Sequence, residues 1–175
     1  SSKNFLTGLL FFNDSDDPND SVQSCTASII NTPNGNIGIT AGHCLINSQG
    51  KAHQDLVFSP GYDHGQDSPL GHIPVAVFQV TNKFRSTCSD DSDYGIMRFA
   101  FEDPSGNNKP LQAHTGAYGW KINIGNNVQT TVVGYPYQGN IPNYGYYAIT
   151  GGVNFGNGAS GASWIWNYDT NTNVG

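Results

Sequence analysis

The sequence predicts an all-β protein built from antiparallel strands, and three observations support this prediction. Short apolar or aromatic runs, rich in Val, Ile, Thr, Phe and Tyr, recur along the 175 residues between turn-forming sequences. No long helical period is present. Only 11% of the residues are charged and 22 are glycines, a composition typical of many short strands joined by turns. The composition alone leaves a sandwich and a barrel as alternatives.

Nine runs are expected to form the strands. In chain order they are 5–12, 26–30, 37–41, 56–60, 73–81, 94–101, 130–137, 144–150 and 163–168. The longest polar stretch that proline bounds, residues 102–110, is the best place for a boundary between two halves. We therefore expect one domain over residues 1–103 and another over 112–175, joined by a linker over 104–111.

Composition and charge exclude several classes of function. The net charge is -6 and the chain has only seven Lys and Arg residues, so we expect no nucleic-acid partner. No stretch is long and apolar enough to cross a bilayer, so we expect no membrane partner. The acidic loop 13–20 is interpreted as a solvated hairpin tip, because Pro18 replaces a calcium ligand and no Glu follows at the right distance. We expect neither a metal nor a cofactor.

The cysteines and two possible glycosylation sites favour a secreted, extracellular glycoprotein. None of the three cysteines lies in a Cys-x-x-Cys pair, and three are too few for a structural zinc site. Asn13 and Asn19 both begin an Asn-x-Ser sequence, although each also fits a plain turn. Disulfide bonds between such cysteines would require an oxidising compartment.

The sequence TAGHC, residues 40–44, contains the candidate general base, His43. Cys25 lies 19 positions before Cys44, at the start of the preceding predicted strand, so a Cys25–Cys44 disulfide would join neighbouring strands. This disulfide would stabilise the fold and fix the direction of the adjacent imidazole, which a general base requires. The remaining histidines are interpreted as surface or satisfied core residues: His53, His64, His72 and His114.

A histidine base also needs a carboxylate that holds its tautomer, and SDDSDYGIM offers three. Asp93 directly precedes the apolar run that begins at Tyr94, so its side chain can be buried. Asp90 and Asp91 lie further out in the polar loop and are expected to be solvated. Asp93 is therefore the preferred partner of His43.

The sequence GNGASGASW, residues 156–164, contains the candidate nucleophile, Ser160. Small residues around one hydroxyl are common in flexible loops, and this stretch alone fits that interpretation as well as a nucleophile on a tight turn.

Taken together, four motifs resemble those of the chymotrypsin-like serine proteases, most of all the secreted microbial branch related to the glutamyl endopeptidases. They are TAGHC around His43, DYGIM from Asp93, VVGYP over 132–136 and GASGASW around Ser160. Their order, His, Asp, Ser, is that of the family, and the resemblance spans residues 5–164. It implies two six-stranded antiparallel β-barrels, the first carrying His43 and Asp93 and the second carrying Ser160.

The resemblance also implies the role of each residue in the hydrolysis of a protein or peptide substrate. Ser160 would attack the scissile carbonyl, His43 would act as the general base and Asp93 would orient it. The backbone N–H groups of Gly158 and Ser160 would form the oxyanion hole. Asn154 and Phe155 would lie near the floor of the substrate pocket, where no acid favours Lys or Arg.

The chain departs from the family near Ser160. Ala159 cannot form the ion pair that activates the animal digestive enzymes, and the sequence ends at Gly175, before the strands that would close the second barrel. We therefore expect an incomplete second barrel and a cleaved C-terminal segment of the same precursor, disulfide-linked through Cys88. Two alternatives stay open: a catalytically silent homologue that acts as a binding or effector module, and an unrelated β-sandwich that binds glycans.

Overall fold

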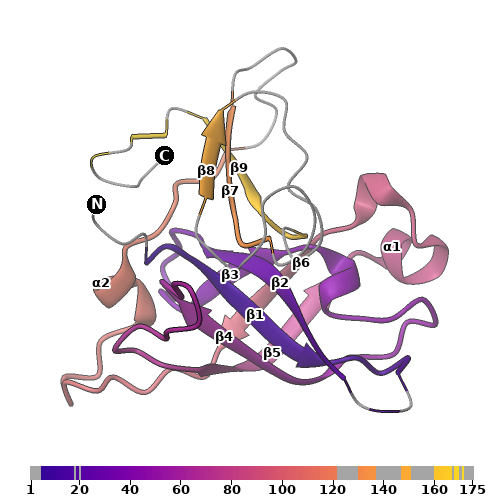
Figure 1. Cartoon of the computed structure of the whole chain (residues 1–175), viewed down its shortest axis with the longest axis horizontal. Helices are drawn as coiled ribbons and strands as arrows, with labels where there is room; N and C mark the ends of the chain where they lie inside the picture. Colours follow the sequence, from indigo (N-terminus) through magenta and orange to yellow (C-terminus); the bar gives the residue numbers. More distant parts are fainter. Residues whose placement is uncertain are drawn as a thin grey trace.

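The protein is described here from a computed structural model (Figure 1), which places residues 5–17, 19, 21–121, 130–136, 147–150, 160–166, 168, 169 and 171. Within these residues, nine strands form two antiparallel sheets, accompanied by two short helices. Each of the nine predicted runs overlaps one of these strands. The same residues include no helix that is both long and apolar enough to cross a membrane.

The first sheet is a closed six-stranded barrel, so the prediction of barrels rather than a sandwich is confirmed. Its strands follow one another around the barrel in the order β1-β2-β3-β6-β5-β4. The bounds are β1 Thr7–Asn13, β2 Val22–Ile29, β3 Ile37–Thr40, β4 Gln54–Pro60, β5 Ile73–Val80 and β6 Gly95–Phe99. Closure pairs every strand on both sides and leaves the barrel without a free edge.

Alternating side chains fill the barrel. Along β6, Met97 and Phe99 are buried whereas Ile96 and Arg98 between and beside them are exposed, which is the two-residue period of a strand with one face in the core. Phe99 stacks on Phe58 with ring centroids 4.8 Å apart. The core of the barrel is therefore apolar, whereas His43 follows the end of β3 and Asp93 precedes the start of β6.

Short helices and 3₁₀ turns lie in the connections outside the strands, and α1 and α2 lie on opposite sides of the molecule (Figure 1). Helix α1 (Asn82–Thr87) was missed in the sequence, although Thr81 marks its start: the Thr81 hydroxyl accepts a hydrogen bond from Phe84 N–H at 3.0 Å. The other short helices are α2 (Leu111–Thr115) and the 3₁₀ turns η1 (Gly42–Cys44) and η2 (Asp90–Ser92). These turns are too short to give a helical period, so the sequence could not reveal them.

The second sheet has three strands in the described part of the chain and lies against one side of the barrel (Figure 1). It has the order β8-β7-β9, with bounds β7 Thr130–Gly134, β8 Tyr147–Thr150 and β9 Ser163–Trp166. This partial sheet agrees with the expected incomplete second barrel. One hydrophobic cluster at this sheet contains the buried residues Leu6, Tyr118, Val133 and Ile165.

The polar stretch between the two halves is held together by one carboxylate. Asp103 accepts hydrogen bonds from the hydroxyl and N–H of Ser105 and from Lys109 N–H. The Ser105 hydroxyl first and Lys109 N–H second hold the pKa of Asp103 well below its ordinary value. All barrel strands precede this stretch and all described strands of the second sheet follow it. However, Leu111, which follows the stretch, packs into the barrel core, and Leu6, which precedes it, packs into the hydrophobic cluster at the second sheet. The domain bounds 1–103, 104–111 and 112–175 stay a prediction.

We expect the Leu10→Ala variant to lower the free energy of unfolding by about 2–5 kcal/mol, because it leaves a cavity in a packed core. Leu10 is fully buried in β1. Val22→Ala is the matched control, since Val22 is 67% exposed and its truncation should change stability by less than about 0.5 kcal/mol. Urea unfolding followed by tryptophan fluorescence measures both. Equal losses in the two variants would contradict the barrel core described above.

Candidate active site

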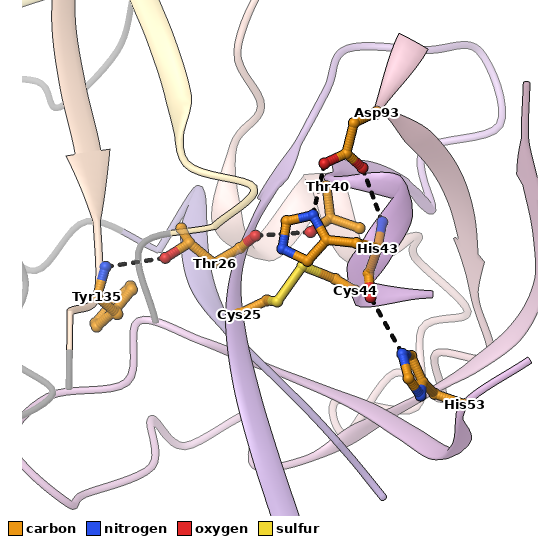
Figure 2. Close-up of a disulfide and its surroundings, with 8 residues drawn as sticks. All are labelled: Cys25, Thr26, Thr40, His43, Cys44, His53, Asp93 and Tyr135. Carbon is orange, nitrogen blue, oxygen red and sulfur yellow. Dashed lines mark hydrogen bonds and ion pairs between the residues drawn. A yellow bond between two sulfur atoms is a disulfide. The ribbon is translucent and has the colours of Figure 1, made fainter. Parts of the chain in front are cut away.

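His43 lies on the η1 turn, directly after β3, and a disulfide holds this turn against β2 (Figure 2). The Cys25 and Cys44 sulfurs are bonded, which confirms the pairing predicted from the sequence. Cys44 lies in the turn that follows β3 rather than in a strand, so the bond joins β2 to the segment that carries the imidazole. Cys44 is fully buried whereas the His43 side chain is 50% exposed. The result is an imidazole with a fixed backbone and an open face.

Asp93 makes two contacts with His43. Its Oδ2 lies 2.6 Å from His43 Nδ1, and its Oδ1 accepts a hydrogen bond from His43 N–H at 2.8 Å (Figure 2). A carboxylate only accepts, so Nδ1 carries the proton and Nε2 has a free lone pair. Asp93 follows η2, and its side chain is 20% exposed. This is the tautomer that a general base at Nε2 requires.

The neighbouring acids behave as predicted. Asp90 and Asp91 are exposed, and Asp91 pairs with Lys83 on α1. The Lys83 ammonium, followed by the Ser89 hydroxyl, lowers the pKa of Asp91. Among the described residues, neither forms a hydrogen bond or ion pair with His43, so Asp93 is the acid that the fold brings to the imidazole.

His53 contacts the backbone of His43, which the sequence did not predict. Its side chain is buried and stacks on Phe12 at 4.6 Å, in agreement with the interpretation as a satisfied core residue. Its Nδ1 accepts from Ser15 N–H at 3.2 Å, so Nε2 is the donor, and it lies 3.1 Å from the backbone oxygen of His43 (Figure 2). His53 therefore fixes the carbonyl of His43 while Asp93 fixes its N–H. The other three histidines pair with acids: His64 with Asp63, His72 with Asp67 and His114 with Asp103.

Thr26 on β2 joins the segment of Ser160 to the barrel. Its N–H donates to the Ser160 carbonyl oxygen at 2.7 Å, and its hydroxyl accepts from Tyr135 N–H at 2.9 Å. Its own carbonyl accepts from the Thr40 hydroxyl at 2.8 Å (Figure 2). Thr26 is fully buried and directly follows Cys25. One strand thus holds both the disulfide beside His43 and the turn of Ser160.

Gly161 allows the turn of Ser160 to approach Thr26 and Thr40 closely. Its φ is +83°, and a Cβ at this position would lie 2.3 Å from the Thr26 carbonyl oxygen and 2.3 Å from the Thr40 hydroxyl oxygen. No other residue type fits this space and this conformation. The glycine after Ser160 in the sequence is therefore a requirement of the close contact between the two halves.

Ser160 and His43 line one pocket of about 390 Å³, together with the Cys25 half of the disulfide. The structure thus brings Asp93 into contact with His43 and places Ser160 in the pocket onto which His43 opens. Gly158, Asn154 and Phe155, the expected oxyanion donor and pocket residues, lie outside the described residues.

Among the described residues, the close group of possible metal ligands at the site is not free to bind an ion. Cys25, His43 and Cys44 are the group of described residues whose ligand atoms lie close enough together to hold an ion. Both sulfurs belong to the disulfide, and a metal would need them as thiolates.

Solved structures share the fold of this chain. The thermostable serine protease AL20 from an extremophilic microorganism is 22% identical, with a TM-score of 0.83 over 95% of this chain and 81% of that chain. The protease Anisep from Arthrobacter nicotinovorans is 19% identical, with a TM-score of 0.85 over 97% and 81%. A Glu endopeptidase in complex with MPD is 15% identical, with a TM-score of 0.71 over 95% and 75%. No protein-family model matches the chain, and no curated protein matches it in sequence.

The chain has the chymotrypsin-like serine protease fold. The barrel and the partial second sheet, together with these three proteases, carry this conclusion. In the chymotrypsin-like fold of this chain, β2 is one of the strands that contact both halves, and β1 and β3 contact the second half as well.

We expect the Gly161→Ala variant to lose far more stability than Gly106→Ala. Both glycines have a positive φ, +83° and +74°, so the backbone strain of the substitution is similar. A Cβ at Gly106 meets nothing within 4 Å, whereas one at Gly161 overlaps Thr26 and Thr40. Urea unfolding measures the difference, which we expect to exceed about 2 kcal/mol, in the range of overpacked sites. Equal losses would contradict the close packing of the Ser160 turn against the barrel.

Proposed function

We propose that the protein is a secreted serine endopeptidase with Ser160 as the nucleophile, His43 as the general base and Asp93 as the residue that orients His43. The single observation that carries this proposal is the pair of contacts from Asp93 to His43. They leave Nε2 as an acceptor on the side of a pocket that Ser160 also lines. The serine proteases of the same fold support it.

The chemistry follows from these positions. The Ser160 oxygen attacks the carbonyl carbon of the scissile peptide bond while its proton passes to His43 Nε2. The oxygen of the tetrahedral intermediate takes hydrogen bonds from the backbone N–H groups of Gly158 and Ser160. His43 then gives the proton to the leaving amine, and water, deprotonated by His43, releases the acyl group from Ser160.

Asp93 contributes through His43 rather than through the substrate. It holds the proton on Nδ1, so that the lone pair of Nε2 faces the pocket, and its negative charge stabilises the imidazolium that forms during the attack. His53 and the disulfide limit the movement of the His43 backbone. The base thus needs little rearrangement in the transition state.

The Ser160→Ala variant should lose at least about 10³-fold in kcat/KM on a quenched peptide library, because the acyl-enzyme cannot form. Ser86→Ala, which removes an exposed hydroxyl on α1, is the matched control and should keep full activity. Mass spectrometry of the cleaved peptides identifies internal peptide bonds as the substrate. Peptide hydrolysis that survives in Ser160→Ala, or a wild-type protein that cleaves nothing, rejects the proposal in favour of a silent binding homologue.

The Asp93→Asn variant should lower kcat on the order of 10⁴-fold with a small change in KM, because an amide favours the wrong tautomer of His43. Asp91→Asn removes the same charge two residues away and should have no such effect, since Asp91 pairs with Lys83. Steady-state kinetics on one cleaved peptide compares the two. A similar kcat in both variants would show that Asp93 does not orient a catalytic base.

Secretion and the expected modifications are part of this proposal. The disulfide supports an oxidising compartment. Asn19 is exposed, whereas the amide of Asn13 donates to Asp55 at 2.8 Å, so Asn19 is the more accessible glycosylation site. Cys88 is an exposed free thiol, as a disulfide to a cleaved segment of the precursor requires. The intact mass of the secreted protein, with and without reductant, tests both modifications.

A further inference from the structure

The geometry points to His53 as a positioning residue for the catalytic base. Its Nε2–H holds the carbonyl of His43, and the loop between β1 and β2 keeps His53 in the tautomer that can donate this hydrogen bond. This inference rests on the proposed endopeptidase function and adds to it a residue on which the rate of the chemical step depends. His53 bonds to the backbone of His43 rather than to its imidazole, so it acts through His43.

The turn that carries His43 leaves the carbonyl of this residue to a side chain. The turn, η1, has three residues, and the carbonyls of Ala41 and Gly42 accept backbone N–H groups within it. The carbonyl of His43 lies near the end of the turn, where helical carbonyls lose their backbone partners. His53 Nε2 donates to this oxygen at 3.1 Å (Figure 2). A histidine side chain thus ends the turn, as basic side chains do at the C-termini of helices.

Two different residues hold the two ends of His43. Asp93 Oδ1 accepts from the N–H of His43 at 2.8 Å, and His53 donates to its carbonyl. The first contact fixes the peptide plane before His43, and the second fixes the plane after it. Since φ and ψ are the only soft backbone dihedrals of a residue, the two contacts together set the direction in which the imidazole leaves the backbone. Removal of His53 releases the second plane while Asp93 still holds the first.

His53 is placed by contacts of its backbone and of its ring. Its N–H donates to the carbonyl of Leu45 at 2.9 Å, which brings it beside the segment that follows the turn. Its ring stacks on Phe12 of β1 with centroids 4.6 Å apart, and its side chain is 5% exposed. A buried ring between two fixed segments has little freedom, so the position of Nε2 is defined.

The loop between β1 and β2 selects the tautomer of His53. Ser15 N–H donates to Nδ1 at 3.2 Å, and a nitrogen that accepts carries no proton. The neutral ring therefore bears its proton on Nε2, where it faces the carbonyl of His43. The carboxylate of Asp14 lies 3.8 Å from the same Nδ1, beyond hydrogen-bond distance. A backbone N–H, which cannot change its protonation, thus sets the direction of the bond to His43.

A displaced imidazole lowers the rate rather than the affinity for substrate. In the proposed reaction His43 Nε2 takes the proton of Ser160, and both residues line the pocket of about 390 Å³ that His53 also lines. A displacement of about 1 Å costs on the order of 10²-fold in rate, because attack and proton transfer need a narrow geometry. The buried side chain of His53 offers a substrate little surface, so we expect KM to stay nearly constant.

Three substitutions separate the hydrogen bond to His43 from the packing on Phe12. In His53→Gln, the amide nitrogen lies about as far from the backbone as Nε2 and can still donate to the His43 carbonyl. In His53→Asn, the amide can still accept from Ser15 N–H but is too short to reach this carbonyl. His53→Leu does neither. All three variants lose the stacked ring.

His53→Asn and His53→Leu should lower kcat on a quenched peptide about 10- to 100-fold, with KM within about twofold of the wild type. His53→Gln should keep kcat within about threefold, since it restores the donor. Urea unfolding identifies the conditions in which every variant is folded. His72→Leu is the matched control, because the His72 ring lies 5.6 Å from Phe11, the neighbour of Phe12, and its loss should leave kcat unchanged.

Equal losses of kcat in the three His53 variants would show that His53 only packs on Phe12, and this result overturns the positioning role. Full kcat in all three variants overturns it as well. A loss that appears in KM alone also overturns it, because His53 would then contact the substrate.

Failure of this role differs from failure of the proposed function. If the wild-type protein cleaves no peptide, the endopeptidase proposal fails, and His53 is judged by the proton NMR signal of His43 Nδ1–H. This proton lies in the 2.6 Å contact with Asp93, so it resonates far downfield. The signal should shift or broaden in His53→Leu and His53→Asn and persist in His53→Gln. A wild-type protein without this signal, or an unchanged signal in all three variants, rejects the positioning role.

Discussion

Strand β2 is the constraint on which the site depends, because two adjacent residues of this strand hold the turn of His43 and the turn of Ser160. Cys25 fixes the turn of His43 through the disulfide, and Thr26 fixes the turn of Ser160 through its N–H. The closed barrel gives β2 a partner on each side, so neither attachment can slide without breaking ladder hydrogen bonds. Residues from distant parts of the sequence therefore meet on a rigid element, which is what a pre-organised site requires.

Next to this strand, three hydrogen bonds hold the His43 residue in place. Asp93 uses both carboxylate oxygens on His43, and His53 occupies its carbonyl, so the backbone and Nδ1 are fixed while Nε2 stays open. Gly161 brings the Ser160 turn against Thr26 and Thr40 without a side chain between them. Asp14 and Asp16 line the pocket that His43 and Ser160 also line.

Much of this architecture could be predicted from local sequence. All nine strands arise from β-branched and aromatic runs, and the Cys25–Cys44 pairing and the choice of Asp93 over Asp90 and Asp91 follow from position relative to those runs. The roles of Thr26 and His53 could not be predicted, because both depend on contacts between segments far apart in the chain. Thr26 has the sequence pattern of an ordinary strand residue. Its role comes from its hydrogen bonds with Ser160 and Tyr135, which are more than 100 residues away in the chain.

The most direct test of the central claim is the reaction of the folded protein with a fluorophosphonate, which esterifies a serine that an adjacent base activates. Tandem mass spectrometry should locate the adduct on Ser160 and not on Ser163 of the same peptide, and His43→Ala should slow the labelling by orders of magnitude. Folded wild-type protein that stays unlabelled, or that is labelled equally fast without His43, would contradict the account of an imidazole and an alcohol brought together by β2.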